Sequence, residues 1–320
     1  MGDYAAETGA HKQKVKKSGI KYTLYKQRQL LLMLLPTLAV LTIFTYKPVL
    51  GWIIAFKDYR VGQNLADAEW IGLDTFKEFF IDSSDAMDVL RNTLVMNISA
   101  LIINLFCALV FSILLNEIRH KFSKSVVQTL SLFPFFISWV IGYSLLVIFF
   151  SVNSGLLNML LVEYKFLENG INILGDAKYS WVLTMFVNLW KSLGYNSIIF
   201  LAAIAGIDTQ QYEAAEIDGA GRFAKIRHIT VPSIMPTLVV LIILNSGMLL
   251  NSNFEQFYLL TNPTNITTME VFDMYIYKFG LKLAKFPYAT AVSIVKTIVS
   301  IIMLIIVNML CKKLANRSLF

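Results

Sequence analysis

The chain has 320 residues, of which 56% are hydrophobic and only 15% are charged, and its mean hydropathy is +0.61. This balance excludes an ordinary soluble protein, and the length leaves no room for a second large soluble domain beside several membrane spans. The formal net charge of +7 suits an anionic membrane lipid surface, so it gives no reason to infer a nucleic-acid partner.

Six apolar stretches follow one another along the chain. A helix needs about 20 apolar residues to cross the hydrocarbon core of a bilayer. A soluble helix does not stay apolar around its whole circumference over such a length. The sequence predicts spans at residues 30–56, 92–115, 126–150, 180–204, 237–260 and 289–311. We therefore expect an all-α integral membrane protein with about six transmembrane helices.

The remaining segments are short. A basic segment (1–29) precedes the membrane domain (30–311), and a tail (312–320) follows it. The first apolar stretch is long enough to span and lacks a small-residue cleavage site, so we expect it to remain as an uncleaved span. Cys107 and Cys311 both lie in apolar stretches, and we expect free thiols rather than a disulfide.

Charge asymmetry between the connections predicts the orientation. Basic residues cluster in four places that share one side if there are six spans: Lys12, Lys14, Lys16, Lys17, Lys21, Lys26 and Arg28; Arg119, Lys121 and Lys124; Arg222, Lys225 and Arg227; Lys312, Lys313 and Arg317. The connection between the first two spans is instead acidic, with Asp67, Glu69, Asp74, Glu78, Asp82, Asp85 and Asp88. The positive-inside rule then places both termini in the cytoplasm.

The connection between the fourth and fifth spans (205–236) has the most informative local pattern. Asp208 followed by Gln211 has the form of a capping box, which predicts a helix that begins near Thr209. The residues at 212–217 are good helix formers and continue it. We expect this helix to lie on the cytoplasmic face.

Gly219 is expected to end that helix, because glycine readily adopts the left-handed conformation of a helix C-terminus. A second short helix is predicted at 222–229, before Pro232 and Pro236 lead into the fifth span. Small side chains beside the turn would let another surface approach the backbone closely. From these residues alone, an amphipathic connector that rests on the membrane is an equally good interpretation.

The same connection resembles the EAA signature of bacterial binding-protein-dependent ABC importer permeases. The matching residues are Glu213-Ala214-Ala215, Asp218-Gly219-Ala220, Ile229, Pro232 and Pro236. Residues 46–76 are similar to the N-terminal third of permeases for complex oligosaccharides, through Tyr46-Lys47-Pro48, Gly51, Ala55-Phe56-Lys57-Asp58-Tyr59, Trp70-Ile71-Gly72-Leu73 and Phe76. The resemblance extends over residues 28–320. Gly221 departs from it, since many relatives carry a bulkier polar residue there.

The resemblance implies a type I ABC importer permease fold in the bacterial cell membrane. It implies that the connection is a coupling helix docked on an ATPase, with the contact formed by Glu213, Ala214, Ala215, Asp218 and Gly219. It also implies four partners: a second homologous permease subunit, a cytoplasmic ABC ATPase dimer that binds ATP-Mg, an extracellular solute-binding protein and an oligosaccharide. The chain has no G-x-x-x-x-G-K-[ST] sequence, so we expect no cofactor and no catalytic residue of its own.

Polar residues inside the predicted spans are the candidates for the substrate path, because a polar group in hydrocarbon costs free energy unless it faces protein or water. They are Trp190, Lys191, Tyr195, Asn196, Asn245, Asn251, Asn253 and Glu255. Aromatic faces beside amides suit a sugar. Hydrogen bonds between helices are the competing explanation, and Lys191 is also suited to snorkelling or to pairing with Glu255. Lys296 is expected to pack or to pair.

Other classes of membrane protein are less well supported. His11, His120 and His228 all lie outside the spans and form no H-E-x-x-H spacing, so the sequence predicts neither a metal site nor a membrane enzyme. A secondary, ion-coupled transporter would need inverted repeats, and none is visible. A sensor or scaffold, and an ABC importer permease for a solute other than a sugar, remain as alternatives.

Overall fold

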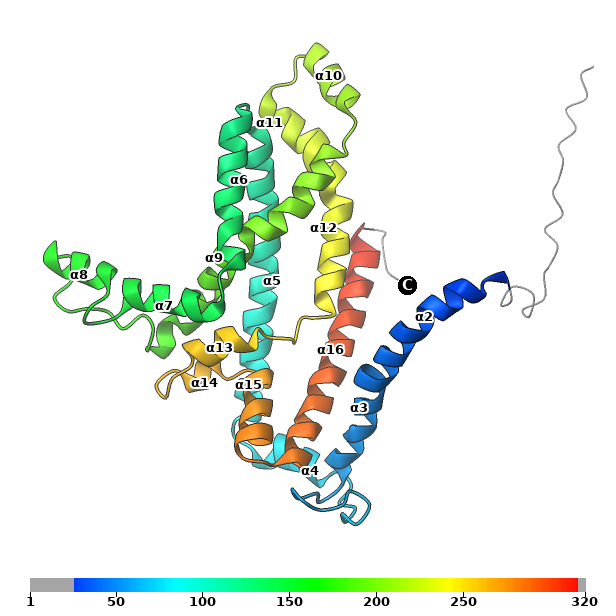
Figure 1. Cartoon of the computed structure of the whole chain (residues 1–320). Coiled ribbons are helices and arrows are strands. Elements are labelled where there is room, and N and C mark those ends of the chain that lie inside the picture. The colour runs from blue at the N-terminus through cyan, green and yellow to red at the C-terminus, as the bar shows by residue number, and fades with distance from the viewer. Residues whose placement is uncertain (1–25, 316–320) are drawn as a thin grey trace, which may run out of the picture. The chain divides into compact units, whose positions relative to one another are not determined.

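The computed structural model describes residues 26–315 (Figure 1), and within this range every regular element is a helix. An isolated antiparallel bridge joins Lys57 and Trp70. The predicted all-α class is confirmed. Residues 1–25 and 316–320 lie outside this range. They include the predicted basic residues from Lys12 to Lys21 and Arg317 in the tail.

The chain divides into two compact units, residues 1–53 and 54–320. The first apolar stretch is one helical segment from Arg28 to Phe56. Its successive parts are α2 (Arg28–Leu41), the π-helical turn η1 (Thr42–Tyr46), α3 (Lys47–Val49) and the 3-10 segment η2 (Leu50–Phe56). The predicted first span at 30–56 is confirmed, and Pro48 is tolerated because it falls in the first turn of α3.

Long helices form the frame of the second unit. They are α5 (Ala86–Glu117), α6 (Lys121–Phe136), α9 (Ala177–Ala205), α12 (Val231–Ser246) and α16 (Phe286–Ala315). Helix α9 packs against α5 and α6, and α12 packs against α16. Close approach of α6 and α9 depends on Gly194, since a methyl group there would overlap the backbone at Ser131.

Shorter helices connect the frame. They are α4 (Asp74–Lys77), η3 (Glu78–Asp82), α7 (Trp139–Phe150), α8 (Leu156–Glu163), α10 (Thr209–Ile217), α11 (Arg222–Lys225), η4 (Ile226–Thr230), α13 (Phe254–Leu260), α14 (Ile266–Met269), α15 (Phe272–Tyr277) and η5 (Lys278–Lys282). Helices α10 and α11 lie at one end of the frame, and α4 and α15 lie toward the other (Figure 1). A buried cluster of Phe79, Phe272, Tyr275 and Tyr288 holds this second end together.

Among residues 26–315, four helices are long and apolar enough to cross a membrane, or six if each of two bent pairs counts as one span. The predicted third span (126–150) is wrong as a continuous helix, because α6 and α7 meet at a bend of 104°. Pro134 lies in the last turn of α6, and Ser138 caps α7 by accepting a hydrogen bond from the backbone N–H of Ile141. The backbone therefore stops and restarts within the apolar stretch.

The predicted fifth span (237–260) is also wrong in its bounds. One helical run extends from Arg222 to Ser246, so the predicted short helix at 222–229 is continuous with the span. The π-turn η4 precedes Pro232, which falls in the first turn of α12. Beyond Ser246 the chain turns, and residues 251–253 are not helical.

Candidate functional site

Helix α10 begins as the sequence predicts. Asp208 is its N-cap, and its carboxylate accepts a hydrogen bond of 3.0 Å from the backbone N–H of Gln210. This satisfies one of the backbone donors that a helix start leaves open. The first helix of the connection therefore stands where the capping pattern places it.

Gly219 makes the turn that ends α10. Its φ is +78°, in the left-handed region that side chains disfavour. The backbone N–H of Ala220 bonds to the carbonyl of Ala215, and that of Gly219 bonds to the carbonyl of Glu216. This pair of hydrogen bonds is a Schellman motif, which pairs the last carbonyls of the helix. The predicted role of Gly219 in the turn is thus seen in the backbone.

Three side-chain contacts fix this connection. The hydroxyls of Tyr212 and Thr230 lie 2.9 Å apart, which joins α10 to η4. Arg222 forms an ion pair of 3.8 Å with Glu117 at the end of α5. Lys225 pairs with the carboxylate of Glu216, and a hydrogen bond and the nearby positive charge lower the pKa of that carboxylate.

The surface of the connection is open to a partner. Glu213, Ala214, Asp218 and Gly219 are exposed, and Ala215 is partly buried. Two large apolar side chains beside them are also exposed, Ile217 by 88% and Phe223 by 76%. The connection therefore presents a small-residue surface bordered by apolar side chains. Sequence reasoning missed Ile217, although a large apolar residue beside a motif of small ones was a readable signal.

Lys191 contacts the bend between α6 and α7. Its ammonium donates hydrogen bonds to the carbonyls of Pro134 (3.3 Å), Phe135 (3.2 Å) and Ile137, and it lies 5.2 Å from the ring centre of Trp139. These carbonyls lie at and just after the end of α6, where no further turn of the helix donates to them, although the carbonyl of Pro134 also accepts from the backbone N–H of Ile137 (3.2 Å). In the described part of the chain Lys191 has no ion pair with Glu255.

The other candidates on α9 and α12 do not gather at one point. Tyr195 stacks on Phe135, with ring centres 4.3 Å apart, and Trp190 is partly exposed. Asn196 is half-buried. Asn245 is exposed and donates to the carbonyl of Leu241 in its own helix.

Two of the substrate-path candidates lie beside a small cavity at the break after α12. It has a volume of about 130 Å³, and its lining includes Asn251 and Asn253. Asn253 also caps α13 by accepting a bond from the backbone N–H of Gln256. Glu255 is exposed and does not line the cavity. The prediction that these residues lie along a fifth span is wrong, because they lie in the break and in α13.

Two amide side chains were missed in the sequence: Asn188, which lines this cavity, and Asn104, which bonds to it. Asn188 donates to the side chain of Gln256 (3.2 Å) and accepts from Asn104 (2.7 Å). Gln256, which is buried, also donates to the carbonyl of Thr184 (2.9 Å). This network joins α5, α9 and α13 through hydrogen bonds, which are costly to leave unmade inside an apolar environment. An Asn near the middle of the second predicted span and another near the middle of the fourth were the available signals.

Lys296 forms an ion pair of 2.6 Å with Asp273, and both side chains are largely buried. The other carboxylate oxygen of Asp273 accepts from the backbone N–H of Ser252 (2.9 Å), whose hydroxyl accepts from Asn97 (3.0 Å). The expectation that Lys296 pairs is confirmed. This second network fixes the break after α12 against α5, α15 and α16.

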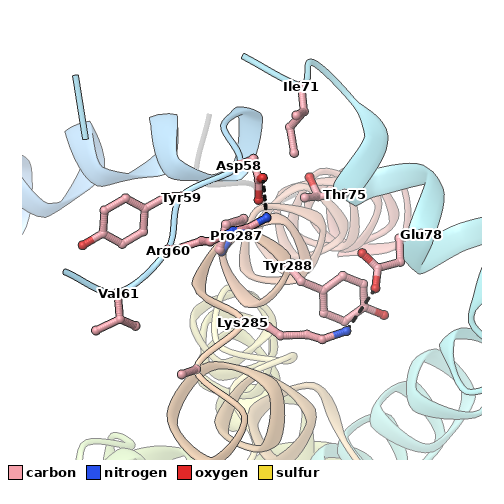
Figure 2. A pocket seen from close by; sticks show the side chains of 11 residues that line it. Asp58, Tyr59, Arg60, Val61, Ile71, Thr75, Glu78, Lys285, Pro287 and Tyr288 are labelled. Atoms are coloured by element: carbon pink, nitrogen blue, oxygen red, sulfur yellow. Dashed lines mark hydrogen bonds and ion pairs between the residues drawn. The ribbon is translucent and has the colours of Figure 1, made fainter. Parts of the chain in front are cut away.

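The end of the second unit that is opposite α10 has a polar pocket of about 320 Å³ (Figure 2). Ion pairs between Asp58 and Arg60 (3.3 Å) and between Glu78 and Lys285 (3.5 Å) lie on its walls. Thr75 anchors α4 by donating to the carbonyl of Ala55 (2.6 Å).

Cysteine and metal chemistry give no further site. Cys107 and Cys311 are both free, as the sequence predicts. Among residues 26–315, no three His, Cys, Asp or Glu side chains are arranged to hold a metal ion.

Comparison with known proteins places this geometry in a family. Residues 100–317 match the family described as binding-protein-dependent transport system inner membrane component. Protein LplB of Bacillus subtilis (strain 168) is 39% identical over 297 residues, 93% of this chain and 92% of that protein. The polygalacturonan/rhamnogalacturonan transport system permease protein YteP of the same organism is 39% identical over 308 residues, 96% of this chain and 95% of that one.

A solved structure is similar over nearly the same length. It is a bacterial alginate ABC transporter in complex with an alginate pentasaccharide-bound periplasmic protein. Its matching chain is 32% identical, with a TM-score of 0.85, and the match covers 94% of this chain and 99% of that one.

Proposed function

The chain belongs to the family of binding-protein-dependent transport system inner membrane components, and on this premise we propose that it takes up oligosaccharides as one permease subunit of an ATP-driven importer. It is a multi-pass inner-membrane permease component of the ABC type. The substrate, the partners and the roles of single residues are the proposal.

The observation that carries the proposal is the geometry of the connection at 205–236. Helix α10 ends in a glycine turn at one end of the frame, and Glu213, Ala214 and Gly219 are exposed there. An exposed carboxylate beside small residues suits docking into a cleft of another protein, because the backbone can approach closely and the charge can pair. We infer that a cytoplasmic ATPase docks here, with Asp218 and Ala215 beside the contact.

The substrate class is supported by two observations. YteP is a polygalacturonan/rhamnogalacturonan transport system permease protein, and the similar solved structure is an alginate transporter. In this chain, amide side chains from three helices meet beside a cavity. Amides donate to and accept from hydroxyl groups, which a sugar offers in large number.

We infer two further partners and assign ATP-Mg to the ATPase. A second permease subunit would close the pathway, because the amide-lined cavity within this chain alone has a volume of only about 130 Å³. An extracellular solute-binding protein would deliver the sugar to the end that carries α4. ATP-Mg would be bound by the ATPase and not by this chain, which lacks a phosphate-binding loop sequence.

The docking role is tested with Glu213→Ala in the complete importer, reconstituted in lipid vesicles. ATP-dependent uptake is expected to fall about tenfold or more, since a hydrogen bond to a charged group contributes about 1.5–3 kcal/mol. Gln211→Ala is the matched control: Gln211 is exposed and lies on nearly the opposite side of α10. Equal uptake by both variants, with normal amounts of assembled complex, would remove Glu213 from the contact.

A further inference from the structure

A groove separate from the amide-lined cavity lies between the end of α13, the loop after it, α15 and η5. Its volume is about 610 Å³, within the range of about 300–1,000 Å³ that holds small ligands. This segment follows the end of α12 and precedes the start of α16. In the orientation predicted from the basic residues, the groove therefore opens on the side from which substrate arrives.

Two tyrosines form one wall of the groove. The rings of Tyr258 and Tyr277 are 5.7 Å apart and nearly perpendicular, at 85°. Tyr258 is 43% exposed. Neither hydroxyl has a hydrogen-bond partner within the described ranges. Each ring therefore offers an apolar surface together with an unused polar group, which is the combination that a sugar ring requires.

Two lysines place positive charge beside these rings. The ammonium of Lys282 lies 5.6 Å from the ring centre of Tyr258 and 5.4 Å from that of Tyr277. Lys278 pairs with Glu270 at 3.0 Å, whereas Lys282 has no ion pair in the part of the chain that the structure describes. Two ammonium groups and one carboxylate line the groove, so one positive charge is uncompensated.

We propose that this groove is an entry subsite for acidic oligosaccharides. Tyr258 and Tyr277 contact the faces and hydroxyls of the sugar rings, and Lys282 binds a uronate carboxylate. The inference rests on the proposed function and adds the charge of the substrate to it. A neutral sugar would leave Lys282 without a carboxylate, and a small inorganic anion would make no use of the tyrosine rings.

The test uses the whole complex of permeases and ATPase in lipid nanodiscs, without a binding protein. Trigalacturonate and its carboxyl-reduced form differ only in the carboxylates, and their dissociation constants are measured by saturation-transfer NMR titration. Lys282→Gln should weaken trigalacturonate about three- to fivefold, the scale of an exposed ion pair, and leave the reduced sugar unchanged. Tyr277→Leu should weaken both sugars.

Lys178→Gln is the control, because Lys178 is an exposed lysine that lies over a tyrosine ring at the start of α9 and does not line the groove. It should change neither dissociation constant. Equal affinity of Lys282→Gln and the unaltered chain for trigalacturonate, or equal losses for both sugars, would overturn the acidic subsite. If only the acidic subsite is wrong, the complex still takes up oligosaccharides with ATP. If it shows no ATP-dependent uptake of any oligosaccharide, the proposed function is wrong as well.

Discussion

At the scale of single residues, substitutions at Gly219 and Gly221 distinguish the effect of backbone conformation from the effect of steric contact. A methyl group would meet nothing within 4 Å at either position, but φ is +78° at Gly219 and −71° at Gly221. Gly219→Ala therefore strains the backbone by about 1–2 kcal/mol, and Gly221→Ala does not.

We expect Gly219→Ala to lower the stimulation of the partner ATPase, measured in reconstituted vesicles, while Gly221→Ala leaves it near normal. The reason is that α10 and α11 are held at their angle by the left-handed turn between them. Equal stimulation by the two variants would show that docking does not depend on this turn.

At the scale of elements, the bend between α6 and α7 depends on a side chain from α9. Lys191 donates to three carbonyls at the end of α6. Without it the carbonyls of Phe135 and Ile137 lose this donor within the apolar stretch, whereas the carbonyl of Pro134 keeps the backbone N–H of Ile137. Lys191→Met should lower the free energy of unfolding by about 1–3 kcal/mol.

The measurement is the midpoint of heat-induced unfolding of the detergent-purified protein. Lys191→Met should lower it, Lys191→Arg should lower it less because the guanidinium keeps its donors, and Lys178→Met is the control on the exposed first turn of the same helix. A midpoint for Lys191→Met equal to that of the control would mean that the bend is held by packing alone.

The elements also show what the sequence could and could not predict. Hydropathy located the apolar stretches, and the capping and glycine signals located α10 and its turn, because both depend on neighbours along the chain. The helix breaks after Phe136 and Ser246 were missed. Apolar composition continues through the first break, and the two breaks are held in place by tertiary contacts from Lys191 and Asp273 respectively. For the same reason the polar cavity was only partly predicted, through Asn251 and Asn253 but without Asn188.

At the scale of the whole molecule, the orientation in the membrane is a prediction from basic residues. Asp82 and Ser123 are exposed and belong to connections predicted on opposite sides. In a chain whose Cys107 and Cys311 are replaced by serine, a cysteine at position 82 should react with an impermeant thiol reagent added to intact cells, and one at position 123 should not. Labelling at position 123 would reverse the orientation and place α10 outside the cell.

Energy coupling is the central claim, and uptake with a controlled energy source tests it most directly. The permease pair, the ATPase and the solute-binding protein are reconstituted in vesicles, and uptake of labelled oligosaccharide is followed with ATP, with ADP, and with ion gradients imposed or collapsed. We predict uptake with ATP alone, unaffected by collapse of the gradients. Uptake that persists with ADP and follows an ion gradient would contradict the account and indicate a secondary transporter.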